Sequence, residues 1–341
     1  MQRRSFLKLS ALTFTSLLGQ AGCRDGGSSE DGGPTYEIVD DPAKFPQSLA
    51  SGDPRSSTVV LWTRVEDPDF VDEDYAVELE IWPLSEGGEP AGDTDGEDRA
   101  STIVAVTAEA RFDHCVKVRV EGLSAATSYG YRFFYIRDGI GYASGEGQTR
   151  TAPEPDADVP VRFAFVSCQD YGGRYYNGYA ALGSEPLDFF VHLGDYIYET
   201  AGDSSFQEGD DDRSVSFDDQ DGALPLTASD GSTFYAARSL DNYRQLYRTF
   251  RSDAALRALH ERVPMIAIWD DHEFSDDCHG STATYTDGRQ DETDAARRAA
   301  ANQAWFEYMP VDYQEPEQAP EFVYDPAVAF PGDLVIYRDF V

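Results

Sequence analysis

Short apolar and alternating runs in the first half of the chain predict β-strands. They occupy residues 58–65, 75–82, 115–120 and 129–136. Within the second run, Val77, Leu79 and Ile81 fall on one face, as expected of a strand with one buried side. Turn signals rich in Gly, Pro and Asp separate the runs, and no convincing helical pattern interrupts them. The pattern therefore predicts a small all-β sandwich over residues 45–150.

The pattern changes after residues 151–160, a polar, Pro-rich stretch that we interpret as a linker. Continuous apolar runs follow at 161–168, 187–195 and 263–271, as in a sheet covered on both faces. Helical spacing predicts helices that begin at Ser239, at Ser252–Asp253 and near Asp294, and Pro310 ends the last one. Strands that alternate with helices predict an α/β domain over residues 161–341.

Two segments of this second domain do not fit the alternation. Residues 201–235 are acidic, rich in Ser and Gly and without periodicity, which predicts an exposed insertion. Residues 330–341 (FPGDLVIYRDFV) predict the start of a further strand. Because so few clear strands occupy this half, we expect the α/β domain to be incomplete and the chain to be C-terminally truncated.

The N-terminus predicts an export signal. Residues 1–23 combine an Arg-Arg pair, a short apolar stretch and small residues before Cys23, which resembles a twin-arginine signal. The GQAGC run resembles a lipoprotein cleavage site, so Cys23 is a candidate lipid anchor, although Gln20 is unusual there. Residues 24–44 predict a flexible tether. We therefore expect an exported protein that is periplasmic or anchored at the cell surface.

Composition narrows the range of partners. The formal net charge is −36, and only three of the 27 basic residues are lysines. Such a surface repels nucleic acid and anionic membranes, so we expect no sequence-specific nucleic-acid binding. The mean hydropathy of −0.49 argues against an integral membrane protein beyond the N-terminal segment. With Cys23 lipidated, three of the four cysteines remain, of which Cys115 and Cys278 could pair.

Each apolar run of the second half ends in reactive side chains. The first ends at Cys168, the second at Asp195 with Tyr198 close behind, and the third at Asp271-His272. Ligands bind at the carboxyl ends of strands in open α/β sheets, so these groups should converge. A thiolate and a phenolate favour a trivalent or borderline transition metal, and neighbouring carboxylates favour calcium or magnesium. The sequence therefore predicts a metal site, with room for more than one ion.

Each group has a plain structural explanation when it is taken alone. A cysteine at a strand end is often a small core residue, and Tyr198 could simply pack. The run Asp270–Glu273 could be a solvated turn. The coincidence of three ligand-bearing strand ends favours the metal site over these explanations.

The motifs also match a family pattern. GDYIY (194–198), WDDHE (269–273) and VSCQD (166–170) resemble blocks of the calcineurin-like, purple acid phosphatase-like metallophosphoesterases. Together with ASGDPRSSTVVLWTRV (50–65), they resemble PhoD-type alkaline phosphatase/phosphodiesterases. The resemblance implies an α/β/β/α-type domain behind a sandwich. Residues 120–135 resemble the late strands of fibronectin type III-like domains, with Tyr129 at the tyrosine corner.

The resemblance implies a role for each candidate residue. Cys168 and Tyr198 would bind Fe3+, Asp195 would bridge it to Ca2+, and Asp271 would bind the Ca2+. His272 would contact the phosphate or protonate the leaving group. The expected activity is hydrolysis of phosphomonoesters, phosphodiesters or both.

One departure keeps an alternative open. The family has a late Gly-Asp-x-His block, and nothing after Asp271 matches it. The alternative is a non-catalytic surface lipoprotein that binds calcium or a phosphorylated polymer through an incomplete site.

Overall fold

The computed structural model describes only part of the chain. The described residues are 36–312, except 86, 87, 89, 91–100, 204–212 and 286, together with 336 and 338–340. Among these residues, no helix is long and apolar enough to cross a membrane. The expected export signal and most of the strand expected at 330–341 lie outside the described residues.

The first sheet contains most of the strands expected in the N-terminal half. Its strands are β1 (Glu37–Asp40), β8 (Ile140–Ala143), β7 (Ser128–Arg137), β4 (Tyr75–Pro83) and β5 (Thr102–Ala108), in that order, with β9 (Gly147–Arg150) paired to β7. Strand β1 pairs in parallel with β8. The tether expected over 24–44 is therefore too long, because its last residues belong to this sheet.

The second sheet joins the two halves of the chain. Its order is β10 (Phe163–Val166), β11 (Phe189–His192), β15 (Met265–Ala267), β2 (Leu49–Gly52), β3 (Thr58–Arg64) and β6 (Cys115–Glu121). The first four strands are parallel, and β2, β3 and β6 are antiparallel. The sheet passes from one half to the other where Gly52 of β2 pairs with Met265 of β15.

The core of the N-terminal half lies between these two sheets. Leu61 and Val118 of the second sheet are fully buried with Leu79 and Phe133 of the first. Alternating side chains on facing strands interdigitate in this way in β-sandwiches. The Tyr129 hydroxyl accepts a hydrogen bond from the backbone of Ser124 at 2.9 Å, which is the contact of a tyrosine corner.

The two faces of the second sheet are covered unequally at its parallel end. Phe190 of β11 is fully buried and faces His260 at the end of α3 (Ala254–His260), with ring centroids 5.5 Å apart. On the other face, Phe163 and Phe165 of β10 are 55% and 69% exposed. None of the described residues supplies the cover expected on this second face, and β10 is an edge strand among them.

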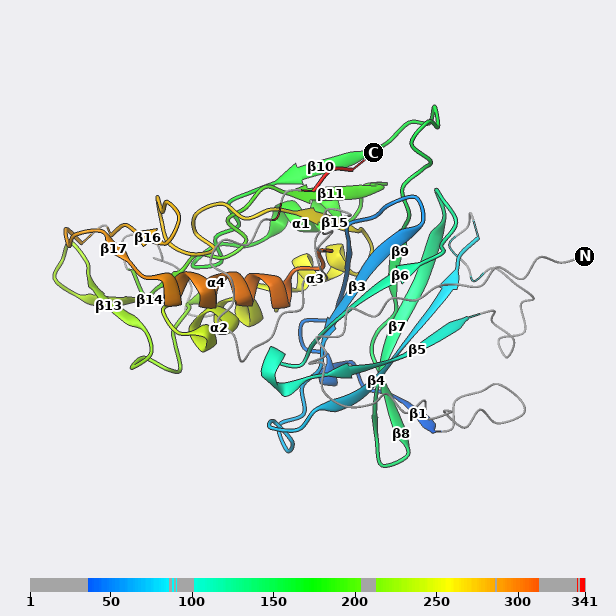
Figure 1. Ribbon diagram of the computed structural model, residues 1–341, viewed down its shortest axis with the longest axis horizontal. Helices are drawn as coiled ribbons and strands as arrows, with labels where there is room; N and C mark the ends of the chain where they lie inside the picture. Colours follow the sequence, from blue (N-terminus) through cyan, green and yellow to red (C-terminus); the bar gives the residue numbers. More distant parts are fainter. Residues whose placement is uncertain are drawn as a thin grey trace, which may run out of the picture.

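The predicted helices are confirmed. They are α2 (Leu240–Phe250), α3 and α4 (Ala295–Tyr308), and a short helix that the sequence analysis missed is α1 (Asn177–Leu182). Ser239 caps α2 and forms a capping box with Asn242. The side chains of Asp253 and Asp294 cap the other two. Figure 1 shows α2 and α4 beside each other, away from the strands of the first sheet.

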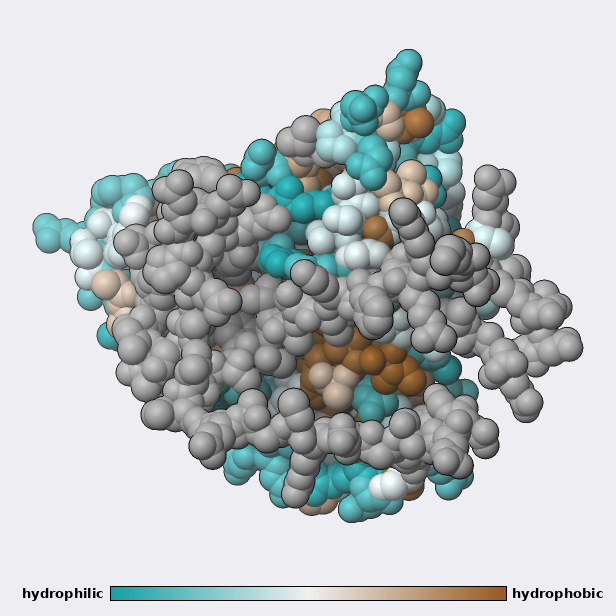
Figure 2. Space-filling model, turned by 45° about the vertical axis from the view of Figure 1, so that its right-hand side comes forward, coloured by the Kyte–Doolittle hydropathy of each residue, from teal (hydrophilic) through white to brown (hydrophobic). Residues whose placement is uncertain are grey.

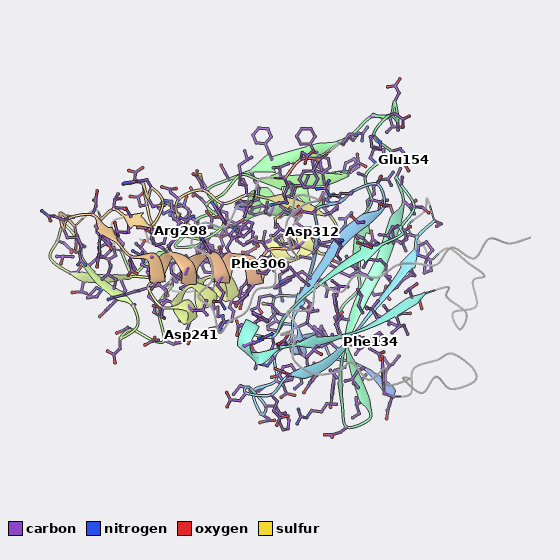
Figure 3. The ribbon with its side chains drawn as sticks, in the orientation of Figure 1. Phe134, Glu154, Asp241, Arg298, Phe306 and Asp312 are labelled. Atoms are coloured by element: carbon purple, nitrogen blue, oxygen red, sulfur yellow. The ribbon has the colours of Figure 1, made fainter. Side chains whose placement is uncertain are left out.

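Helix α4 also touches the sandwich. The Trp62 indole donates a hydrogen bond to the Glu307 carbonyl at 2.8 Å, and the buried Lys117 ammonium lies over the Phe306 ring. Figure 3 labels Phe306 on α4 and Asp312 just beyond it, where the two halves meet. Cys115 and Cys278 are free thiols in the structure.

The expected exposed insertion at 201–235 is wrong in its later part. There β12 (Thr200–Ala201), β14 (Thr233–Ala236) and β13 (Leu224–Thr227) form a small antiparallel sheet. Leu226 and Phe234 are buried in a cluster of their own. The strands are too short to show a clear alternation in the sequence. A further two-stranded sheet, β16 (Thr282–Ala283) with β17 (Glu292–Thr293), precedes α4.

Candidate metal centre

The loops after β10 and β11 adopt an unusual backbone. Cys168 and Asp195 have φ angles of 58° and 56°, a region that non-glycine residues rarely occupy. The loops bind each other, because Cys168 N donates to Gly194 O at 3.2 Å. Gly194 has a φ of 106°, and an added Cβ would lie 2.4 Å from the Asp270 nitrogen. Such strained positions cluster at functional sites, where the surrounding structure holds them in place.

The carboxylate of Asp195 is the centre of the site. Its Oδ2 lies 3.3 Å from the Cys168 sulfur and 3.5 Å from the Tyr198 hydroxyl. Its Oδ1 is buried and has no hydrogen-bond partner among the described residues. A buried carboxylate oxygen without a partner is costly, and a bound cation would satisfy it.

The loop after β15 brings the remaining predicted residues to the same place. Ligand atoms of Asp195, Asp271 and His272 all lie within 4.8 Å of one another. All five residues predicted from the sequence therefore meet at the carboxyl edge of the parallel strands. A thiol, a phenol, carboxylates and an imidazole are donors that suit a transition metal beside a harder cation.

Glu273 holds the loops together, and the sequence analysis gave it no role. Its buried carboxylate accepts backbone N–H bonds from Tyr196 at 2.6 Å, Asp270 at 2.8 Å and Asp195 at 3.1 Å. Burial raises the pKa of Glu273 to about 7, although these hydrogen bonds act in the opposite direction. Its place within the WDDHE run was the available signal.

Glu199 positions His272 and was also missed. The His272 Nδ1 lies 2.8 Å from a Glu199 oxygen, and the other Glu199 oxygen accepts the Asp276 N–H at 2.9 Å. Burial alone would lower the pKa of His272, but the bond to Glu199 and nearby carboxylates raise it to about 9. The ring stacks near Tyr198, with centroids 4.2 Å apart. The imidazole is thus fixed in orientation and favours its protonated form.

Without a cation, the proposed ligands resist ionisation. Burial raises the pKa of Asp195, and burial together with the Asp195 charge raises the pKa of Tyr198. A positive ion reverses this preference, because it stabilises the charged form of every ligand around it. The residues present therefore fit a metal centre.

The surroundings of the site are acidic. Asp170 follows β10 and pairs with Arg174 at 2.8 Å, and Asp276 and Asp277 follow His272. On the face shown in Figure 2, much of the described surface is hydrophilic, and hydrophobic residues gather in one patch. An acidic neighbourhood raises the local concentration of cations.

Three strand ends that present a thiol, a phenol, carboxylates and an imidazole define the kind of site found in metal-dependent enzymes. Sequence comparison identifies the family. The profile of PhoD-like phosphatases matches residues 163–340, and the profile of their N-terminal domain matches residues 34–153. The chain belongs to the PhoD-like phosphatase family.

Two relatives show how far the similarity extends. Alkaline phosphatase D of Bacillus subtilis (strain 168) is 33% identical over 306 residues, which are 87% of this chain and 44% of that protein. A solved structure of PhoD has a TM-score of 0.61 and 32% identity, and the match covers 79% of this chain and 46% of that one. The chain spans less than half the length of either relative.

Proposed function

We propose that the protein is an exported metallophosphoesterase that hydrolyses phosphomonoesters, phosphodiesters or both. Family membership supports the reaction class. The twin-arginine-like residues 1–23 support export, and Cys23 is the proposed lipid anchor. We also propose that the N-terminal half is a fibronectin III-like sandwich and that residues from 161 form part of an α/β/β/α metallophosphoesterase domain.

The observation that carries the proposal is the convergence on Asp195. Cys168 and Tyr198 would hold Fe3+, Asp195 would bridge the two ions, and Asp271 would hold Ca2+. When bound, such a pair of ions polarises a phosphoryl oxygen and makes water a better nucleophile. The orphaned Oδ1 of Asp195 and the resistance of its neighbours to ionisation support this assignment.

His272 would supply the proton for the leaving group. In the hydrolysis, a water oxygen bonds to phosphorus, and the bond from phosphorus to the ester oxygen breaks. The water loses one proton, and the ester oxygen gains one and leaves as an alcohol. Glu199 fixes the ring through Nδ1, so the proton would be donated from Nε2, which lies 3.5 Å from an Asp276 oxygen.

The first test is replacement of Asp195. Asp195→Asn should abolish hydrolysis of a chromogenic phosphate ester and should remove the bound iron. Circular dichroism should show that the fold is intact. Asp241→Asn on α2 (labelled in Figure 3) is the matched control, because that carboxylate is 74% exposed. Near-normal turnover in Asp195→Asn would overturn the bridging role.

The second test reads the iron directly. Fe3+ bound by a tyrosinate gives a broad visible absorption band, so the mature protein should be coloured and contain iron and calcium. Tyr198→Phe should remove that band. An unchanged spectrum would remove Tyr198 from the iron site.

The alternative is a binding protein without turnover that uses the same acidic donors. That protein would retain calcium and a phosphorylated polymer without releasing phosphate. Release of phosphate that requires both metals would exclude it.

A further inference from the structure

A cavity opens beside the candidate metal centre. It has a volume of about 150 Å3, and Tyr198 and His272 form the wall on the side of the site. The opposite wall comes from the β13–β14 hairpin through Leu226, Phe234 and Ala236. A group attached to a phosphate at the metal centre could therefore enter the cavity past His272.

The hairpin wall is rigid and apolar. Leu226, Phe234 and Ala236 are at most 4% exposed and form a small hydrophobic cluster with Tyr285 packed against it. Leu226 and Phe234 are partners in the antiparallel pairing of β13 with β14, so their side chains lie next to each other on one face. Such a wall suits the carbon skeleton of a small organic group.

The remaining wall is acidic. Asp170, Glu199, Asp203 and Asp276 all line the cavity, and none of the described residues that line it is lysine or arginine. Glu199 and Asp276 face the two nitrogens of His272, and Arg174 pairs with Asp170 from outside the lining. An ammonium group near these carboxylates would be attracted more strongly than an anionic group.

We propose that this cavity is the leaving-group subsite and that it selects small alcohols without negative charge, with amino alcohols preferred. The inference rests on the proposed hydrolysis and adds its substrate class. The alcohol skeleton packs against Leu226 and Phe234, while its oxygen lies at His272. The carboxylates around Asp276 reject alcohols that carry a carboxylate or a second phosphate.

The test uses esters of similar size that differ in charge. Phosphoethanolamine, propyl phosphate and phosphoglycolate place a cationic, a neutral and an anionic leaving group at the same position. We expect kcat/KM to fall in that order, by at least about tenfold from first to last, which corresponds to about 1.4 kcal/mol. Equal values for the three esters would overturn the subsite.

A charge added to the wall should reverse this order. Leu226→Lys places an ammonium group in the cavity and should raise kcat/KM for phosphoglycolate relative to phosphoethanolamine. Thr284→Lys is the second variant, because Thr284 lines the cavity but is only partly buried and tolerates a longer side chain. Thr233→Lys is the matched control, since it adds the same charge at an exposed position of the same hairpin.

The outcomes distinguish a failure of the proposed function from a failure of the proposed subsite. If the metal-loaded protein hydrolyses neither these monoesters nor a chromogenic phosphodiester, the proposed function fails. If it hydrolyses only the diester, the proposed function stands and the subsite assignment fails. If hydrolysis occurs but Thr233→Lys shifts selectivity as much as Thr284→Lys, the effect is long-range and the subsite assignment fails. A shift confined to the variants that line the cavity supports it.

Discussion

Two buried aspartates follow parallel strands of the same sheet, but the side chains around them differ. Asp53 follows β2 and Asp195 follows β11, with φ angles of 45° and 56°. Arg338 lies 2.8 Å from one Asp53 oxygen, and Asp312 N donates to that oxygen at 2.7 Å. Asp195 has no arginine partner among the described residues, and its Oδ1 has no hydrogen bond.

The comparison separates structural from functional carboxylates. A buried charge must be paired or must bind a cation, because its transfer from water is costly. At Asp53, the chain supplies its own cation and closes the contact between the two halves. At Asp195, the chain supplies a thiol, a phenol, a further carboxylate and an imidazole instead of an arginine, and this donor set suits an added metal ion.

The largest expected effect is the loss of stability when Arg338, the partner of Asp53, is replaced. Arg338→Met should destabilise the protein by about 3 kcal/mol at pH 8, because it leaves the Asp53 charge buried and alone. Urea denaturation measures this loss. Arg289→Met is the control: its pair with Asp287 is more exposed and should contribute less than about 1 kcal/mol.

The same variant should show a defined pH dependence. Burial raises the pKa of Asp53 to about 6, against the lowering effect of Arg338. Ionisation of Asp53 above this pKa therefore costs stability, and Arg338 offsets part of that cost only at a pH where Asp53 is charged. The cost of Arg338→Met should shrink from pH 8 to pH 5. A constant cost would contradict the assignment.

A smaller effect is expected from the residue that holds the loops around Asp195. Glu273→Gln places an amide N–H2 among backbone donors and loosens the metal ligands. We expect a loss of about 10–100-fold in metal affinity or activity. Titration of the metal-free protein with iron and calcium measures the change. Glu292→Gln on the exposed β17 should have no such effect.

The smallest expected effect is the change in stability of the metal-free protein when Asp195 is replaced. In metal-free protein, Asp195→Asn removes a buried charge that has no arginine or lysine partner among the described residues and whose Oδ1 has no hydrogen bond, and it should stabilise the fold by about 1 kcal/mol. Thermal unfolding of both proteins in a chelator measures it. A destabilised variant would mean that Asp195 has a structural partner in the metal-free protein.

Local patterns were enough to predict which residues meet at the candidate site. Strand ends are visible in the sequence, so the sequence alone places Cys168, Asp195 and His272 at one edge of a sheet. The positioning groups were not visible, because Glu273 acts through backbone atoms of distant loops. Glu199 reaches His272 across more than seventy positions, and no local pattern reports such a contact.

The errors of the fold prediction have a related cause. The pairing of Gly52 with Met265 depends on long-range geometry, so the sequence predicted two neighbouring domains and missed the shared sheet. An apolar run such as β10 indicates a strand but not which faces are covered. The short strands β13 and β14 give too few positions for a period to be seen.

The pairing of β2 with β15 has a consequence for the synthesis of the chain and for its proposed export. The strands lie about 200 residues apart, so the edge of β2 waits roughly 10–40 s for its partner at typical elongation rates. During that time it is an open edge that can pair with another nascent chain. Expressing the N-terminal half alone would make this transient hazard permanent. The proposed export by a pathway that carries folded proteins would suit a chain in which this edge of β2 is paired so late.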